Sequence, residues 1–358
     1  MTHQDQNTQG AAPVKVNHFP GDTWHFLAIS GTTLKLPSRF DRTQAGDDVP
    51  AEVLDKARTI QTGMGGEFDT AFSELVAKSG GKAVFMESAA GLCVKTVGKL
   101  EITATADEAV AADIVVRARK NSDSSFVLAL KSDESDALIG CRLRVLAQEN
   151  ARVHVAVVNL AGGGSKVFAS LGALAEGGAT VEVSEVELGG QAVHSGTRVD
   201  LAGGKSRFVG RAFCLVQEGH TLDMNQTAAQ RGAMSESRFA VDQVLFDGAS
   251  KSWRGTIDFR RGCAGALGDE QEDVLLFGDQ VVNKSLPVIL CDEEAVEGRH
   301  GCSVGKVDEA SLFYMGSRGL DEATAKKLIV TGKAAKVARY IADEALAAEI
   351  RARIDALL

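Results

Sequence analysis

The 358-residue chain has few prolines, few large aromatic residues and no long apolar run. It contains 5 prolines, 2 tryptophans and 2 tyrosines. No segment approaches the roughly 20 consecutive apolar residues that cross a bilayer as a helix. The polar start of the chain lacks the basic region, apolar stretch and cleavage site of a secretory signal. These absences predict a cytoplasmic globular protein without a membrane segment.

The sequence also lacks paired cysteines and a basic patch. Scattered thiols without a CxxC pair fit a reducing compartment better than a disulfide framework. The formal net charge is −9, and no cluster of lysines and arginines provides the footprint that nucleic acid requires. We therefore expect no nucleic-acid partner. The six cysteines are Cys93, Cys141, Cys214, Cys263, Cys291 and Cys302.

The first part of the chain carries helical signals. Residues 1–17 are predicted to form a flexible tail, and residues 18–81 a mixed region with two helices. The first helix follows Pro50, because proline suits the start of a helix. The second spans GEFDTAFSELVAKSGG, in which Phe68 and Phe72 lie on one apolar face.

From Lys82 to Cys291 the apolar pattern changes to a period of two, which is typical of β-strands. The strands are short and separated by Gly, Asn, Asp and Ser, as in a sandwich, a barrel or a β-solenoid. No clean internal repeat distinguishes these architectures. The pattern therefore predicts a mainly β core, bounded at residues 82–316, and leaves its architecture open. Examples are LEITATADEA, SFVLALKSD, RVHVAVVNL and TVEVSEVEL.

Helical periodicity returns in residues 317–358. Asp321 is placed to cap a helix, because its carboxylate can accept hydrogen bonds from the free amides of the first turn. Gly332 is predicted to interrupt this helix, and a final helix continues to Leu357. The apolar faces either cover the end of the β core or meet a partner. One such face carries Ala325, Leu328 and Ile329.

A motif-rich stretch follows the predicted β core. Pro287 leads a strand, residues 292–294 form an acidic run, residues 300–305 read HGCSVG, and residues 313–320 read FYMGSRGL. In order, spacing and residue type over roughly forty positions, this stretch resembles the SufB/SufD family. The resemblance implies a right-handed parallel β-helix core flanked by N-terminal and C-terminal helical regions. It also implies a non-catalytic scaffold role in iron–sulfur cluster assembly by the SUF system.

The resemblance turns attention to His300, which the sequence places in a tight turn. Family members carry this histidine at the interface between SufB and SufD, where the nascent cluster forms. An imidazole nitrogen is a good iron ligand. Cys302 stands at the usual alanine and is the second candidate for contact with the cluster. Glu272 occupies the position of an essential SufB cysteine, and Gly301 that of a SufB glutamate, so the chain resembles the SufD branch.

The same resemblance implies partners and a cargo. SufB would share a transient iron–sulfur cluster with this chain, and SufC would hydrolyse ATP and dock on the C-terminal helical region. Family complexes are also associated with reduced flavin, although no residue here identifies a flavin site. No nucleotide site is expected on this chain, because GGKS at 203–206 lacks the first glycine of a phosphate-binding loop and precedes a strand. The expected SufC-docking residues are Gly319, Leu320, Ala325, Leu328 and Ile329.

Two alternatives are weighed against this interpretation. A SufB-like homodimeric scaffold would work with SufC alone, but glutamate at position 272 in place of cysteine argues against it. A homodimer of the isolated chain stays open. A carbohydrate-acting β-helix enzyme would be exported and would use aromatic platforms, which this sequence does not provide.

Overall fold

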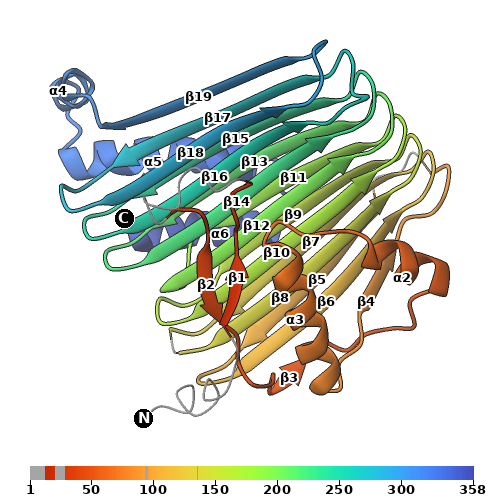
Figure 1. Cartoon of the computed structure of the whole chain (residues 1–358). Helices are drawn as coiled ribbons and strands as arrows, with labels where there is room; N and C mark the ends of the chain where they lie inside the picture. Colours follow the sequence, from red (N-terminus) through yellow and green to blue (C-terminus); the bar gives the residue numbers. More distant parts are fainter. Residues whose placement is uncertain (1–12, 21–28, 93–95, 135) are drawn as a thin grey trace.

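The computed structural model describes residues 13–20, 29–92, 96–134 and 136–358, and Cys93 lies outside these ranges. The chain winds into a solenoid of two parallel β-sheets with helices on the outside (Figure 1). This architecture confirms the predicted parallel β-helix core with flanking helical regions. Every helix within the described ranges is too short or too polar to span a lipid bilayer.

From β4 (Val84–Glu87) onward, successive strands alternate between the two sheets. Sheet 1 contains β3 (Arg42–Thr43), β4 (Val84–Glu87), β6 (Ala109–Ala118), β8 (Leu138–Ala147), β10 (Lys166–Ala175), β12 (Ala192–Leu201), β14 (Thr221–Gln230), β16 (Ser250–Phe259) and β18 (Val282–Cys291). Sheet 2 contains β5 (Thr96–Ala104), β7 (Asp123–Ser132), β9 (Arg152–Leu160), β11 (Thr180–Glu187), β13 (Arg207–Val216), β15 (Glu236–Leu245), β17 (Leu267–Leu276) and β19 (Glu297–Lys306). A separate antiparallel pair is formed by β1 (Pro13–Val16) and β2 (Thr32–Lys35).

The coils are regular although the sequence shows no clean repeat. Ala192 lies beside Thr221, and Thr221 lies beside Ser250, so each of these coils takes 29 residues. One corner of the solenoid repeats a left-handed backbone conformation with φ between 56° and 75°. Asparagine, glycine, lysine and methionine all occupy it, so the repeat is one of backbone shape and not of residue type. The residues at this corner are Asn121, Asn150, Gly178, Lys205, Met234 and Gly265.

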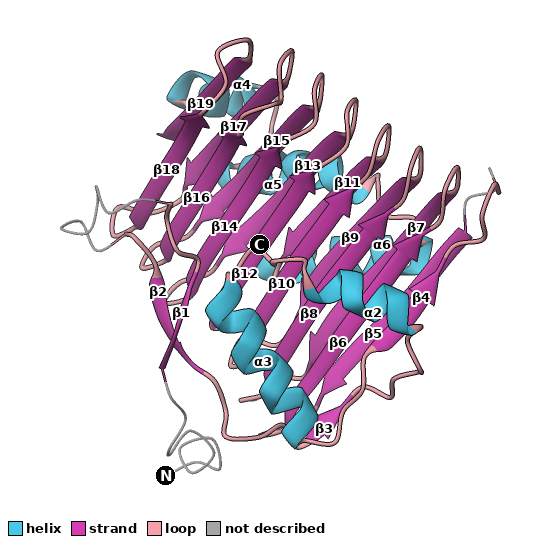
Figure 2. Ribbon diagram, turned by 45° about the vertical axis from the view of Figure 1, so that its right-hand side comes forward, coloured by secondary structure: helices cyan, strands magenta, loops and turns pink. Residues whose placement is uncertain are grey.

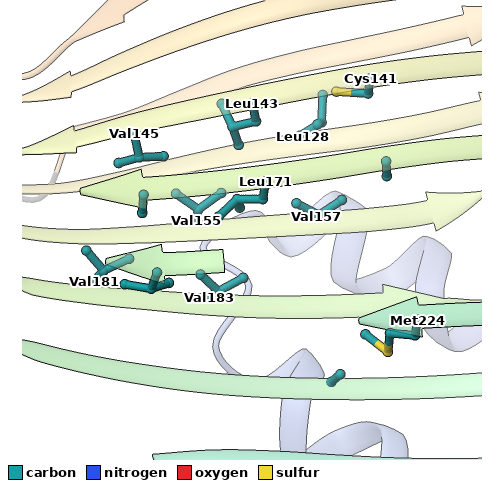
Figure 3. Close-up of a cluster of buried hydrophobic side chains, with 14 of the residues drawn as sticks. Leu128, Cys141, Leu143, Val145, Val155, Val157, Leu171, Val181, Val183 and Met224 are labelled. Atoms are coloured by element: carbon teal, nitrogen blue, oxygen red, sulfur yellow. The ribbon is translucent and has the colours of Figure 1, made fainter. Parts of the chain in front are cut away.

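Apolar side chains fill the space between the two sheets over the first coils. Figure 3 shows Leu143, Val155, Leu171 and Val183 in this interior. Each layer packs on the layers above and below it, so neighbouring coils stabilise one another. Burial of apolar surface is therefore the main source of stability along the solenoid axis.

Helices cover the outer face of each sheet. The helices α2 (Ala51–Arg58) and α3 (Gly66–Lys78) lie over sheet 1 (Figure 2), and α3 buries Phe68 and Phe72 as predicted. The helices α5 (Glu322–Ala338) and α6 (Glu344–Leu357) pack on apolar residues of sheet 2. The shorter α4 (Glu309–Ser317) has no buried residue.

The C-terminal helices differ in two respects from the sequence prediction. α4 begins before residue 317, where helical structure was expected to start. The predicted break at Gly332 is wrong, because α5 runs through it without interruption. Glycine costs a helix about 1 kcal/mol relative to alanine, and the burial of Val330 and Ala334 against sheet 2 offsets this cost. The predicted cap is confirmed: the Asp321 side chain accepts a hydrogen bond from the Thr324 amide.

Candidate functional site

The solenoid has an open end at its last coil. Strands β18 and β19 are the terminal strands of sheets 1 and 2, so neither has a neighbour on its outer edge within the described chain. β19 is exposed along nearly its whole length. Figure 1 shows β18, β19 and the adjacent α4 gathered at this end of the molecule.

His300 lies within β19 and not in the tight turn that the sequence suggested. The register places it directly beside Glu270 of β17, and its Nδ1 atom is 4.0 Å from Glu270 Oε1. The histidine side chain is 48% exposed, whereas Glu270 is fully buried. Burial raises the pKa of Glu270 to about 8. A buried carboxyl group thus underlies a half-exposed imidazole at the open end.

Cys302 shares a strand face with His300, because residues two apart on a strand point to the same side. Its Sγ donates to Glu272 Oε2 at 3.1 Å, in register with the neighbouring strand. Burial, and next the hydrogen bond to Glu272, raise the pKa of the Cys302 thiol to about 11. The thiol is therefore protonated at neutral pH, and the reactive thiolate is disfavoured in the isolated chain.

A buried ion pair supports this end of the solenoid from within. The ammonium group of Lys251 contacts the carboxylate of Glu272, and both side chains are 0% exposed. Lys251 Nζ also donates to Ser285 Oγ at 3.0 Å. The ion pair joins β16 to β17 across the interior, and the hydrogen bond to Ser285 on β18 ties Lys251 to the last coil. Glu272 stands where the resemblance expected SufB proteins to carry cysteine, and here that position is a buried salt-bridge partner.

Polar residues continue inward from the open end. Glu185 accepts from Gln226 Nε2 at 2.9 Å, and Glu187 accepts from Asn159 Nδ2 at 2.8 Å, all within the solenoid. Burial raises the pKa of Glu187 to about 8. Sequence reasoning missed these acids. Their spacing in the sequence indicates their burial: Glu185 and Glu187 follow the buried Val181 and Val183 at intervals of two residues along β11, so all four point to the same side of the strand.

The cysteines and histidines form no ready-made metal centre. Across the described ranges, no group of three or more His, Cys, Asp or Glu side chains is arranged to hold a metal ion. Cys141, Cys214 and Cys263 are buried, and Cys291 is exposed at the end of β18. His300 and Cys302 are the candidates that the fold brings together. GGKS at 203–206 lies in the turn between β12 and β13, with a strand after it as expected.

The residues expected to dock a partner separate into exposed and buried members. Leu328 is 52% exposed, whereas Ala325 is 1% exposed and its side chain is therefore not available at the surface. Gly319 ends α4 with φ 90°, and Leu320 and Ile329 are half-buried. Among the described residues, the largest exposed apolar side chains are on α4: Phe313 is 79% exposed and Tyr314 is 59% exposed. The sequence analysis placed Phe313 and Tyr314 in the family motif but did not predict that they contact a partner.

The fold and this end define the class of protein: a parallel β-solenoid whose final coil presents a histidine and a thiol on an open edge. Residues 101–333 match the family described as SUF system FeS cluster assembly, SufBD core domain. The chain belongs to the SufB/SufD family. The matched region includes both His300 and Cys302.

Relatives of both branches match the chain. The iron–sulfur cluster assembly protein SufD of Bacillus subtilis is 26% identical over 248 residues, which cover 64% of this chain and 54% of that protein. Escherichia coli SufD is 23% identical over 167 residues, covering 47% of this chain and 40% of the relative. Bacillus subtilis SufB is 26% identical over 159 residues, covering 44% and 34%. The chain thus spans about half the length of the SufD proteins that it matches.

Proposed function

We propose that this chain is a SufD-like, non-catalytic scaffold subunit that holds one side of a nascent iron–sulfur cluster at an interface with a SufB-type chain. The observation that carries the proposal is His300, half-exposed on the unpaired edge strand of the open end. An exposed strand edge offers a row of free backbone groups to a second chain. Pairing there would place His300 within the interface.

The chemistry around His300 suits one ligand of a shared cluster. Glu270 lies nearer Nδ1, which leaves Nε2 as the nitrogen for iron. At 4.0 Å Glu270 makes no hydrogen bond to the ring, so the two side chains would have to move closer before the carboxyl group could orient the imidazole. Cys302 ranks second, because its protonated thiol would first have to release a proton. The cluster is cargo in this proposal, and the partner chain supplies the remaining ligands.

The second part of the proposal concerns a SufC-type ATPase partner. Phe313 and Tyr314 of α4, together with Leu328 of α5, expose apolar surface at the C-terminal helical region. An exposed apolar helix face is a recognised way to meet a partner groove. In this arrangement ATP is hydrolysed on the partner, in the cytoplasm, and movement reaches the scaffold through α4 and α5.

The role of His300 can be tested by replacing it with alanine. After co-purification with SufB-type and SufC-type proteins, anaerobic reconstitution should yield at least about tenfold less cluster, because loss of a ligand or its support weakens metal binding by 10–100-fold. Absorbance of the cluster measures the result. Urea unfolding and binding of the SufC-type protein should be unchanged.

Arg299→Ala provides the matched control, since Arg299 is the exposed preceding residue of the same strand. Normal assembly by His300→Ala would reject the proposed site. If the wild-type chain instead assembled a cluster with the SufC-type protein alone, the homodimeric alternative would replace the SufD-like role.

The docking surface predicts a separate binding defect. Phe313→Asp should weaken binding of the SufC-type protein by at least about tenfold, because a charge would replace an exposed aromatic anchor at the interface. Calorimetric titration would measure the affinity. Met234→Asp is the control, as Met234 is 62% exposed but lies in a turn between β14 and β15. If the two variants bound the SufC-type protein with equal affinity, α4 would not be part of the docking surface.

A further inference from the structure

A second polar site lies far from the open end, beneath the N-terminal helices. A cleft of about 610 Å³ opens between the loop before α2, the helices α2 and α3, and the outer face of sheet 1. Its floor carries Asp113 of β6 and Arg142 and Arg144 of β8. Figure 2 shows α2 and α3 crossing this part of the sheet. The floor residues are 3% to 8% exposed.

The two arginines at the floor are bound very differently. Arg142 donates through Nε and Nη2 to Asp113, and through Nη1 to the Asp69 carbonyl and Ser73 Oγ, each at 2.6 Å. Arg144 bonds to the described protein through Nη2 alone, at 3.0 and 2.9 Å from the two Asp113 oxygens. Its Nε is buried without a hydrogen-bond partner. Arg142 thus donates through all three of its nitrogens, whereas Arg144 donates through one.

At the floor of the cleft, two guanidinium groups face a single carboxylate. Asp113 is shared by two arginines. Asp48 pairs with Lys82 at the exposed rim, and Arg58 pairs with Asp55 outside the cleft. Two further acids lie nearby: Asp47 lines the cleft, and Asp69 belongs to α3, where its carboxylate accepts hydrogen bonds from Thr62. Arg144 therefore lines the cavity with fewer protein partners than Arg142 has.

The cleft walls restrict what can occupy it. Val49, Leu54 and Val76 give it apolar sides, and its volume is within the range of pockets for small organic ligands. Planar guanidinium groups match the geometry of carboxylates. We propose that this cleft binds a small organic carboxylate, with the carboxylate on Arg144 and the apolar body against Val49, Leu54 and Val76. The inference is independent of the cluster-assembly role.

The proposal can be tested by titrating the full-length protein with benzoate. We expect a saturable shift of the Arg144 Nε–Hε signal in nitrogen-15 NMR spectra, and no shift with the neutral analogue benzamide. Arg144→Lys should weaken benzoate binding at least tenfold, because lysine lacks the planar fork. Arg198→Lys should leave it unchanged: Arg198 also has a buried Nε without a partner, but it lies outside the cleft.

Leu54→Asp is a second variant that leaves both arginines intact and should abolish benzoate binding by placing an acid in the cleft wall. Urea unfolding establishes that each variant is folded. No saturable shift with benzoate, an equal response to benzamide, or undiminished binding by the two cleft variants would overturn the proposal. Binding of inorganic phosphate as tight as that of benzoate would also overturn it, because the site would then recognise charge without the organic body.

Discussion

Replacing Lys251 with methionine is expected to lower the free energy of unfolding by about 3–5 kcal/mol, because it leaves a buried carboxylate without its partner. Lys251 and Glu272 are both 0% exposed and join the two sheets across the solenoid interior near the open end. Urea unfolding followed by far-ultraviolet circular dichroism measures the change. The physical cause is desolvation: the Glu272 carboxylate would remain inside the solenoid with only the Cys302 thiol as a hydrogen-bond donor.

Two further variants separate this cause from simple loss of contacts. The double variant Lys251→Met with Glu272→Leu should recover most of the lost stability, since apolar residues of similar volume commonly replace a buried ion pair at little cost. Lys306→Met removes the exposed pair with Asp279 and should leave the unfolding midpoint unchanged. An unchanged midpoint for Lys251→Met would show that the pair contributes nothing to the closure of the last coil.

The buried acids give stability a pH dependence. Burial raises the pKa of Glu187 from 4.5 to about 8 in the folded protein. Between these pH values the folded state binds more protons than the unfolded state, so the free energy of unfolding falls as pH rises. The stabilisation by the retained proton is fully present below pH 4.5 and is lost as pH passes about 8. The loss from this one group is on the order of 3–5 kcal/mol.

Glu187→Gln should remove this component, because glutamine resembles the protonated carboxyl group and has no charge to bury. The variant should match the parent protein below pH 4.5 and exceed its stability above pH 8, as measured by urea unfolding across that range. Part of the slope should persist, since burial also raises the pKa of Glu185 and Glu270. Glu218→Gln, on an exposed turn, is the control. Identical pH profiles for parent and Glu187→Gln would contradict the burial of a protonated Glu187.

Local patterns in the sequence predicted much of the fold. The period of two marked the β core, Phe68 and Phe72 marked the buried face of α3, and Asp321 marked the start of α5. These features depend on neighbours within a few residues, where backbone geometry and side-chain spacing are enough. The resemblance to the SufB/SufD family then selected the parallel β-helix among the all-β architectures.

The coil repeat itself was not visible in residue types. The recurring corner needs only a left-handed backbone, and Asn150, Gly178, Lys205 and Met234 all adopt it in successive coils. Packing of each coil on the next stabilises this conformation even where the residue is not glycine or asparagine. Because the repeat lies in backbone conformation and not in residue identity, it cannot be recognised from the amino-acid sequence.

By itself, the sequence determined the strand period, the buried face of α3 and the cap of α5, and its family resemblance marked His300 as the residue to examine. Only the tertiary structure decided that His300 lies on a strand above Glu270, that Lys251 reaches Glu272 across a coil, and that an open edge surrounds them. The reason is physical: Glu270 and His300 are neighbours because β17 and β19 align in parallel register. That register is set by the packing of whole coils, to which residues far apart in the chain contribute together.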